Sequence, residues 1–228
     1  MSRPKRRTEL WRVARYTDPL GFAPRERCSW GHRFDDVQRR YRTLYCASTP
    51  ETALREVLAD LRPNAAVIAK HLEKYGAAAA ASSFPTAAIT EKWRQDNVLV
   101  PCTMTYEGRL LDLTDANDRH EIELRHAELL ARYDMSHLDM HEITTRRRIV
   151  TQTIGTDAFD NLEVAAIRFA SSRDGGACFA LFEDRAELEA AGSPIALTDP
   201  PPQPLETVAT HWGLQLAPAA PARPSATS

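Results

Sequence analysis

The sequence predicts a single α+β domain. Its 228 residues are enough for one sizeable hydrophobic core and few for two. Hydrophobic residues make up 43% of the chain and charged residues 26%, which is typical of globular proteins. Short β-prone runs and helical segments follow one another without an internal repeat. We therefore expect one domain over residues 9–217, with flexible tails at residues 1–8 and 218–228.

The charge balance gives no general attraction to nucleic acids or anionic membranes, because the formal net charge is only −2. The basic run at residues 2–7 is expected to be a solvated end, since no aromatic residues interrupt it. No stretch approaches 18 apolar residues and no signal peptide is evident, so we expect a cytoplasmic protein. The four cysteines lack C-x-x-C spacing and are expected to be reduced: Cys28, Cys46, Cys102 and Cys178.

The first predicted strand covers residues 10–13, and residues 17–31 are rich in Pro, Gly and charge, which predicts a loop. A second strand is expected at Thr43–Ala47, where β-prone residues end at Ser48-Thr49-Pro50. A helix should follow, because Thr49 can cap it, Pro50 suits its first position, and Pro63 lies beyond its end.

This helix carries an apolar stripe and one carboxylate of interest. At 100° per residue, Glu56 lies off the stripe, next to small or polar neighbours that would leave it accessible to a ligand. The stripe consists of Ala53, Leu54, Val57, Leu58 and Leu61.

The middle of the chain predicts further helices and strands. A helix is expected through residues 70–74, then a mobile connection over residues 77–85. Three strands are expected, at residues 98–100, 103–105 and 110–113. Asp115 can cap a helix that carries Ile122, Leu124, Leu129 and Leu130, and another helix should cover residues 144–159.

Two late strands, at residues 164–169 and 178–182, predict a hairpin. The turn between them contains Asp174-Gly175-Gly176, and an Asp-Gly pair adopts positive φ at low cost.

Four short segments of this chain resemble the RES domain, a family named for its arginine, glutamate and serine. The resemblance covers about residues 9–183 and rests on the order and spacing of the segments. They are Gly31-His32-Arg33-Phe34, Leu44-Tyr45-Cys46-Ala47, Ala53-Leu54-Arg55-Glu56 and Ile167-Arg168-Phe169-Ala170-Ser171. The resemblance implies an ADP-ribosyltransferase-like fold, with a compact mixed sheet flanked by helices.

The resemblance also implies an NAD pocket lined by Arg33, Tyr45 and Glu56. These residue types suit the chemistry: a guanidinium grips the pyrophosphate, an aromatic ring supports nicotinamide, and a carboxylate stabilises a ribose cation. The family serine matches Ser171, with Ser172 as the alternative, and its hydroxyl would position the substrate. Arg12 resembles a family arginine that helps to hold the dinucleotide, although a strand-edge cation explains it equally well.

The family contains toxins of bacterial toxin–antitoxin pairs that consume NAD. By resemblance, the chain is expected to be an NAD phosphorylase that releases nicotinamide and forms ADP-ribose-1″-phosphate. Protein mono-ADP-ribosylation and a catalytically silent binding module are the alternatives. NAD would be a substrate and not a resident cofactor, with inorganic phosphate as co-substrate. The implied partner is an antitoxin with a helix-turn-helix domain that blocks the pocket, and a homodimer is also allowed for.

Some positions depart from the family pattern, and competing motifs are weak. His32 and Phe34 stand where the family often has a second glycine and a tryptophan. His137 and His141 have helical metal-ligand spacing but no third ligand, so no metal site is expected. No G-x-G-x-x-G follows a strand and no P-loop motif occurs, which argues against Rossmann-type redox chemistry and P-loop NTPase activity. No G-x-S-x-G surrounds Ser171, so it is not expected to be a nucleophile.

Overall fold

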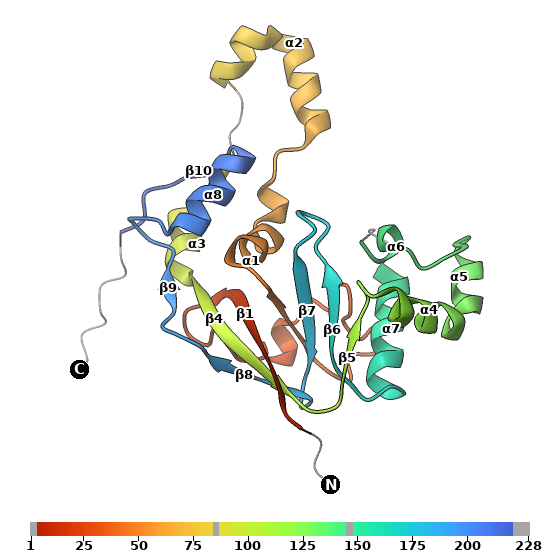
Figure 1. Cartoon of the computed structure of the whole chain (residues 1–228). Coiled ribbons are helices and arrows are strands. Elements are labelled where there is room, and N and C mark those ends of the chain that lie inside the picture. The colour runs from red at the N-terminus through yellow and green to blue at the C-terminus, as the bar shows by residue number, and fades with distance from the viewer. Residues whose placement is uncertain (1–3, 84–86, 145–147, 221–228) are drawn as a thin grey trace.

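A mixed β-sheet runs through the centre of the computed structural model, which describes residues 4–83, 87–144 and 148–220 (Figure 1). Its strands follow the order β5-β6-β7-β2-β1-β4-β8, with β9 paired to β4. The β5–β6 pair is parallel and the other pairs are antiparallel. The strands are β1 (Arg6–Arg15), β2 (Thr43–Ala47), β4 (Asn97–Tyr106), β5 (Arg109–Asp112), β6 (Val164–Ala170), β7 (Ala177–Phe182), β8 (Ala186–Ala190) and β9 (Ile195–Ala196). The predicted α+β class with a mixed sheet is confirmed.

The pairing within the sheet is shortest between β1 and β2, and we call this place the joint between β1 and β2. These strands share one register pair, Trp11 with Ala47, whereas β1 pairs with β4 along all ten of its residues. A separate parallel pair joins β3 (Ala88–Ile89) to β10 (Gln215–Leu216). The joint matters for the site, because both Trp11 and Ala47 line the cavity described below.

Helices cover the sheet unevenly. In Figure 1, α1 lies over the middle of the sheet, α4 to α7 flank β5 and β6, and α2 projects away from the rest of the molecule. The helices are α1 (Pro50–Val57), α2 (Ala65–Ser83), α3 (Glu91–Asp96), α4 (Ala116–Arg125), α5 (Ala127–Arg132), α6 (Met140–Thr144), α7 (Arg148–Asp160) and α8 (Gln203–Trp212). Single 3₁₀ turns occur at Arg25–Arg27 and Ala59–Leu61.

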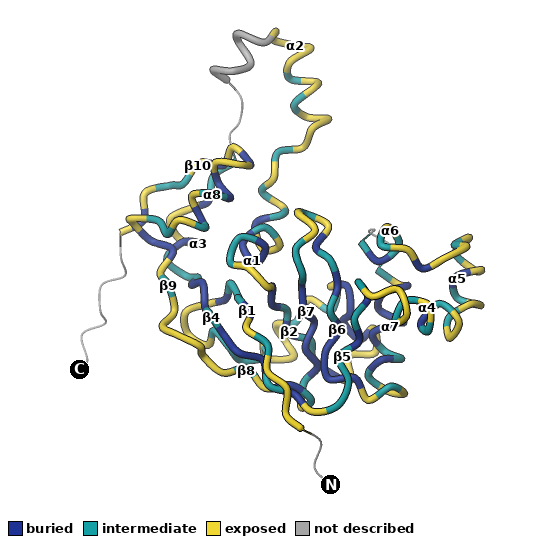
Figure 2. Tube along the Cα trace, in the orientation of Figure 1, coloured by how far each residue is buried: buried dark blue, intermediate teal, exposed yellow. Residues whose placement is uncertain are grey.

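Two groups of buried apolar side chains stabilise this arrangement. The larger group packs α1, α7 and α8 against the sheet and includes Leu54, Ile154 and Val208. The smaller group joins β1 and β4 to β2 and β7, and includes Leu10 and Leu44. Figure 2 shows the buried positions concentrated along β4, β6 and β7, while the described side chains of α2 are mostly exposed.

The segment from β2 to α1 follows the sequence closely. β2 has the predicted bounds, and the Thr49 hydroxyl accepts a hydrogen bond from the Thr52 N–H, as an N-cap does. The helix ends earlier than predicted, at Val57, and continues as the 3₁₀ turn. Val57 is 47% exposed and was wrongly placed in the apolar stripe, because its side chain lines the cavity described below.

The two strands expected at residues 98–100 and 103–105 form one strand, β4. Pro101 does not interrupt it, because its missing N–H falls between the residues that pair with β9 and those that pair with β8. The first strand is also longer than predicted, since residues 6–8 pair with β4 and are not part of a tail.

The helical predictions need three corrections. The expected connection at residues 77–83 belongs to α2, while residues 84–86 lie outside the described residues. The helix capped by Asp115 breaks at His126, and of its apolar residues Leu124 is 66% exposed. The helix expected from residue 144 is described from Arg148, with residues 145–147 outside the described chain.

The hairpin of β6 and β7 is confirmed, with Gly175 at φ 76° in its turn. The C-terminal tail was expected from residue 218, but Ala219 is fully buried: its carbonyl accepts the Asp199 N–H, and its own N–H donates to the Asp199 carboxylate. The described fold therefore reaches at least residue 219. No helix in the described ranges combines the length and the apolar character needed to cross a membrane.

Candidate active site

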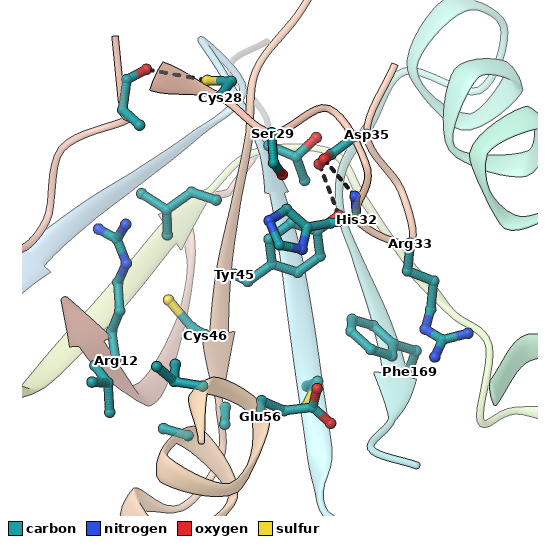
Figure 3. A pocket seen from close by; sticks show the side chains of 18 of the residues that line it. Arg12, Cys28, Ser29, His32, Arg33, Asp35, Tyr45, Cys46, Glu56 and Phe169 are labelled. Atoms are coloured by element: carbon teal, nitrogen blue, oxygen red, sulfur yellow. Dashed lines mark hydrogen bonds between the residues drawn. The ribbon is translucent and has the colours of Figure 1, made fainter. Parts of the chain in front are cut away.

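A cavity of about 520 Å³ opens beside the joint between β1 and β2 (Figure 3). Its walls come from β1, β2, α1, the loop before β2, the start of α7 and the β6–β7 turn. The arginines among its described lining residues are Arg12, Arg27, Arg33, Arg148 and Arg173. The carboxylates among them are Asp35, Glu56 and Asp60. The five arginines outnumber the three carboxylates, so the described lining carries a net positive charge.

Arg33 is buried in the loop before β2, and its guanidinium donates hydrogen bonds to the backbone carbonyls of Ile143 and Thr144. The guanidinium carbon lies 5.9 Å from the centre of the Phe169 ring. Burial, and then the positive charge of Arg148, lower the pKa of Arg33 to about 10, while Glu56 opposes that shift. Arg33 is thus charged at neutral pH and held in place at the cavity wall.

Tyr45 lies on β2 at the centre of the cavity. Its hydroxyl donates a hydrogen bond to Asp35 Oδ1 at 3.1 Å and accepts one from the Phe34 N–H at 2.9 Å. The ring of His32 is tilted against the Tyr45 ring, with 5.4 Å between the centroids, and Figure 3 shows the two rings together. Burial and the nearby Asp35 raise the pKa of Tyr45 well above its usual value, so the phenol stays protonated.

Glu56 and Ser171 form a direct pair. The Ser171 hydroxyl donates to Glu56 Oε1 at 2.5 Å and accepts the Arg173 N–H at 3.0 Å. Ser171 is buried, whereas Glu56 is exposed to the cavity. The serine therefore positions the carboxylate, and Ser172, the alternative, lines the cavity without this bond.

Arg12 approaches from β1, on the opposite side of Tyr45 from Arg33 (Figure 3). One of its terminal nitrogens donates to the carbonyls of Pro19 at 2.7 Å and Gly21 at 3.2 Å. Burial lowers its pKa, with partial compensation from neighbouring groups. Arg12 is therefore a fixed cation of the cavity wall.

The predicted site residues Arg12, Arg33, Tyr45 and Glu56 line one cavity, and Ser171 bonds to one of them. Sequence reasoning missed the roles of Asp35, Arg148 and Arg173. The proximity of Asp35 to the Gly31–Phe34 segment could have drawn attention to it. The other two come from distant segments and carry no motif.

In residues 4–83, 87–144 and 148–220, no three His, Cys, Asp or Glu side chains are grouped so as to hold a metal ion. His137 instead lies 3.3 Å from Glu123. The four cysteines are free.

The chain was compared with known proteins. A family model described as RES domain matches residues 9–204. A solved chain in the crystal structure of the M. tuberculosis MbcT–MbcA toxin–antitoxin complex has a similar fold, with a TM-score of 0.53 and 15% sequence identity. That similarity covers 91% of this chain and 92% of the other. The search of curated proteins found no match. At 15% identity the structural likeness supports the fold alone, while the family match spans every residue of the site.

Proposed function

The chain belongs to the RES domain family, and from that premise we propose that its cavity binds NAD and cleaves the bond between nicotinamide and ribose. The observation that carries the proposal is the Glu56–Ser171 pair, set within a cationic cavity that also contains an aromatic surface. A dinucleotide with two phosphates, a sugar and a planar ring needs these three surfaces.

In the proposed reaction, Glu56 acts on the ribose. As the bond from C1″ to the nicotinamide nitrogen breaks, positive charge develops on the ribose, and a fixed carboxylate stabilises it. Ser171 holds Glu56 in one orientation through its 2.5 Å hydrogen bond. This arrangement lowers the cost of reorganising the carboxylate in the transition state.

The other residues bind and orient the dinucleotide. Arg12 and Arg33 supply positive charge for the pyrophosphate, and the rings of Tyr45 and His32 offer an aromatic surface for nicotinamide. Asp35 fixes the Tyr45 hydroxyl, so that the ring cannot turn away when the ligand enters.

We propose further that the acceptor is inorganic phosphate, which gives ADP-ribose-1″-phosphate, and that the protein is the toxin of a toxin–antitoxin pair. Uncontrolled NAD consumption would harm the cell that makes it, so a partner that covers the cavity is expected. The toxin–antitoxin complex that contains a chain of similar fold supports this assignment.

The test is to incubate the purified protein with NAD, with and without phosphate, and to identify the products by mass spectrometry. Nicotinamide with ADP-ribose-1″-phosphate is expected when phosphate is present. Unchanged NAD under both conditions would refute the proposed activity. Nicotinamide with free ADP-ribose in the presence of phosphate would refute the acceptor but support the cleavage.

A further inference from the structure

Three arginines of the cavity, Arg27, Arg148 and Arg173, have no role in the function proposed above, and two of them, Arg148 and Arg173, act electrostatically on Arg33. Arg148 is the first described residue of α7, and Arg173 lies in the turn between β6 and β7. Both line the same cavity as Glu56. Arg173 is also tied to the reaction centre, because its backbone N–H donates to the Ser171 hydroxyl that holds Glu56.

Neither Arg148 nor Arg173 forms an ion pair within the described part of the chain. Asp174, the sequence neighbour of Arg173, is paired with Arg55. Arg173 Nε is buried without a hydrogen-bond partner. Elsewhere in the described chain, several arginines are paired with carboxylates. Among them are Arg40, Arg42, Arg55, Arg109, Arg125 and Arg168.

Arg33 lines the same cavity as these two arginines. Its pKa is lowered chiefly by burial, next by Arg148, and to a smaller extent by Arg173. Glu56 acts in the opposite direction. Clustered guanidinium groups repel one another, and an oxyanion between them removes that repulsion while accepting their N–H donors.

We propose that Arg148 and Arg173 form the binding site for the inorganic phosphate acceptor, beside the ribose that Glu56 engages. This inference rests on the proposed function. Arg12 and Arg33 already provide two positive charges for the two negative charges of the NAD pyrophosphate. A hydrogenphosphate dianion brings two more negative charges, and the positive charges of Arg148 and Arg173 balance them. The acceptor must also lie close to C1″, which agrees with the link from Arg173 through Ser171 to Glu56.

The reaction balances without a further reactant. One oxygen of hydrogenphosphate forms a bond to C1″, and the bond from C1″ to the ring nitrogen breaks. The electron pair of the broken bond moves to nicotinamide and neutralises its pyridinium charge. The proton of hydrogenphosphate stays on the transferred phosphate group, and nothing is oxidised or reduced.

The kinetic test uses Arg148→Gln and Arg173→Gln, which keep hydrogen-bonding capacity but remove the charge. The control is Arg132→Gln, which removes the same charge from an exposed position on α5. Nicotinamide release is measured while phosphate and NAD are varied separately. Each cavity variant is expected to raise the KM for phosphate about tenfold or more and the KM for NAD less than about threefold.

A larger rise in the KM for NAD than in that for phosphate would overturn the proposal, because the two arginines would then hold the dinucleotide's own phosphates. Unchanged KM values for both substrates would overturn it as well. The control variant should match the wild type in both constants, which excludes a general effect of net charge.

A binding measurement separates this proposal from the function on which it rests. Thermal unfolding is followed in sodium phosphate and in sodium chloride of equal ionic strength, without NAD. Phosphate is expected to raise the Tm of the wild type and the control by at least about 2 °C, and to leave both cavity variants unshifted. Equal shifts in all four proteins would show an adventitious ion only and refute the site. This measurement stands even if the wild type releases no nicotinamide, a result that would refute the activity alone.

Discussion

Two hydroxyl groups each donate a hydrogen bond to a carboxylate of the cavity. The Tyr45 hydroxyl donates to Asp35, and the Ser171 hydroxyl donates to Glu56. Each hydroxyl therefore holds its carboxylate in one orientation at the cavity wall.

Ser171→Ala tests the orienting role and separates it from that of its neighbour. Loss of the hydroxyl frees Glu56 to adopt other rotamers, so kcat for nicotinamide release should fall about 10-fold to 100-fold with little change in Tm. Ser172→Ala should lower kcat less than about threefold. Steady-state kinetics of both variants check this, and a larger defect in Ser172→Ala would transfer the role to that residue.

Tyr45→Phe tests whether the hydroxyl is structural. The ring remains, but Asp35 loses a hydrogen-bond donor and the Phe34 N–H loses its acceptor. Because these groups are buried or partly buried, the free energy of unfolding should fall by about 1–3 kcal/mol. Chemical denaturation measures this loss. A variant as stable as the wild type would show that water replaces the hydroxyl.

At the scale of elements, one turn aligns Ser171 with Glu56. Asp174, in the β6–β7 turn, accepts hydrogen bonds from Thr52 at 2.9 Å and Arg55 at 2.8 Å, both on α1. Gly176 packs so closely on Thr52 that an added Cβ would lie 2.3 Å from its hydroxyl oxygen. The helix that carries Glu56 is thus fastened to the turn that follows Ser171.

Asp174→Asn should loosen this connection and make stability less dependent on pH. Burial alone would raise the pKa of Asp174, but hydrogen bonds from Arg55, Gly176 and Thr52 outweigh it and lower the pKa below 3.8. The stabilisation of the folded state by ionised Asp174 is therefore fully present above the unfolded-state pKa. It is lost as the pH falls through the lower folded-state pKa. At pH 7 the variant should lose about 1–2 kcal/mol.

Thermal unfolding at pH 7 and below pH 4 checks this expectation, with Glu189→Gln as a control that removes an exposed carboxylate on β8. The difference between wild type and Asp174→Asn should shrink in acid. A difference that stays constant would show that the carboxylate charge is not involved.

Elements with strong local signals could be predicted, and those set by distant partners could not. Thr49, Pro50 and the Asp174-Gly175 turn act within a few residues, so β2, the start of α1 and the hairpin were predicted correctly. The continuity of β4 through Pro101 depends on where β8 and β9 pair with it. The break at His126 between α4 and α5 likewise could not be predicted, because no Gly or Pro lies there.

At the scale of the whole molecule, Arg94 connects the C-terminal segment to the sheet. Its side chain is 1% exposed, and it donates to the carbonyls of Leu197 and Ala217 and to Asp199. Asp199 in turn accepts the Ala219 N–H at 2.6 Å. Composition alone suggested a tail from residue 218, because this network needs residues more than 100 positions apart.

A chain that ends at Ala217 should consequently be less stable than one that ends at Ala220. Removal of Ala219 takes away the acceptor of the Asp199 N–H and one of the donors to the Asp199 carboxylate. The expected loss is about 1–2 kcal/mol, or about 2–6 °C in Tm. Equal melting temperatures would show that the C-terminal contacts contribute nothing to stability.

The positions of the site residues follow from the whole fold. Their types and order were recognisable from the family resemblance, but spacing along the chain did not show that Arg12, Arg33, Tyr45 and Glu56 would line one cavity. That result depends on the joint between β1 and β2 and on α1 crossing it. Arg148 and Arg173 were not predicted to line the cavity for the same reason: only the whole fold brings them there.

In the proposed reaction the carboxylate of Glu56 drives cleavage of NAD, and its replacement by an amide tests this role. Nicotinamide release from NAD is compared between the wild type and Glu56→Gln, with the Tm of each protein as the check on folding. The amide keeps the shape and removes the charge, so the rate should fall about 100-fold or more at nearly constant Tm. A folded Glu56→Gln protein that releases nicotinamide at the wild-type rate would contradict the proposed role of the Glu56 carboxylate.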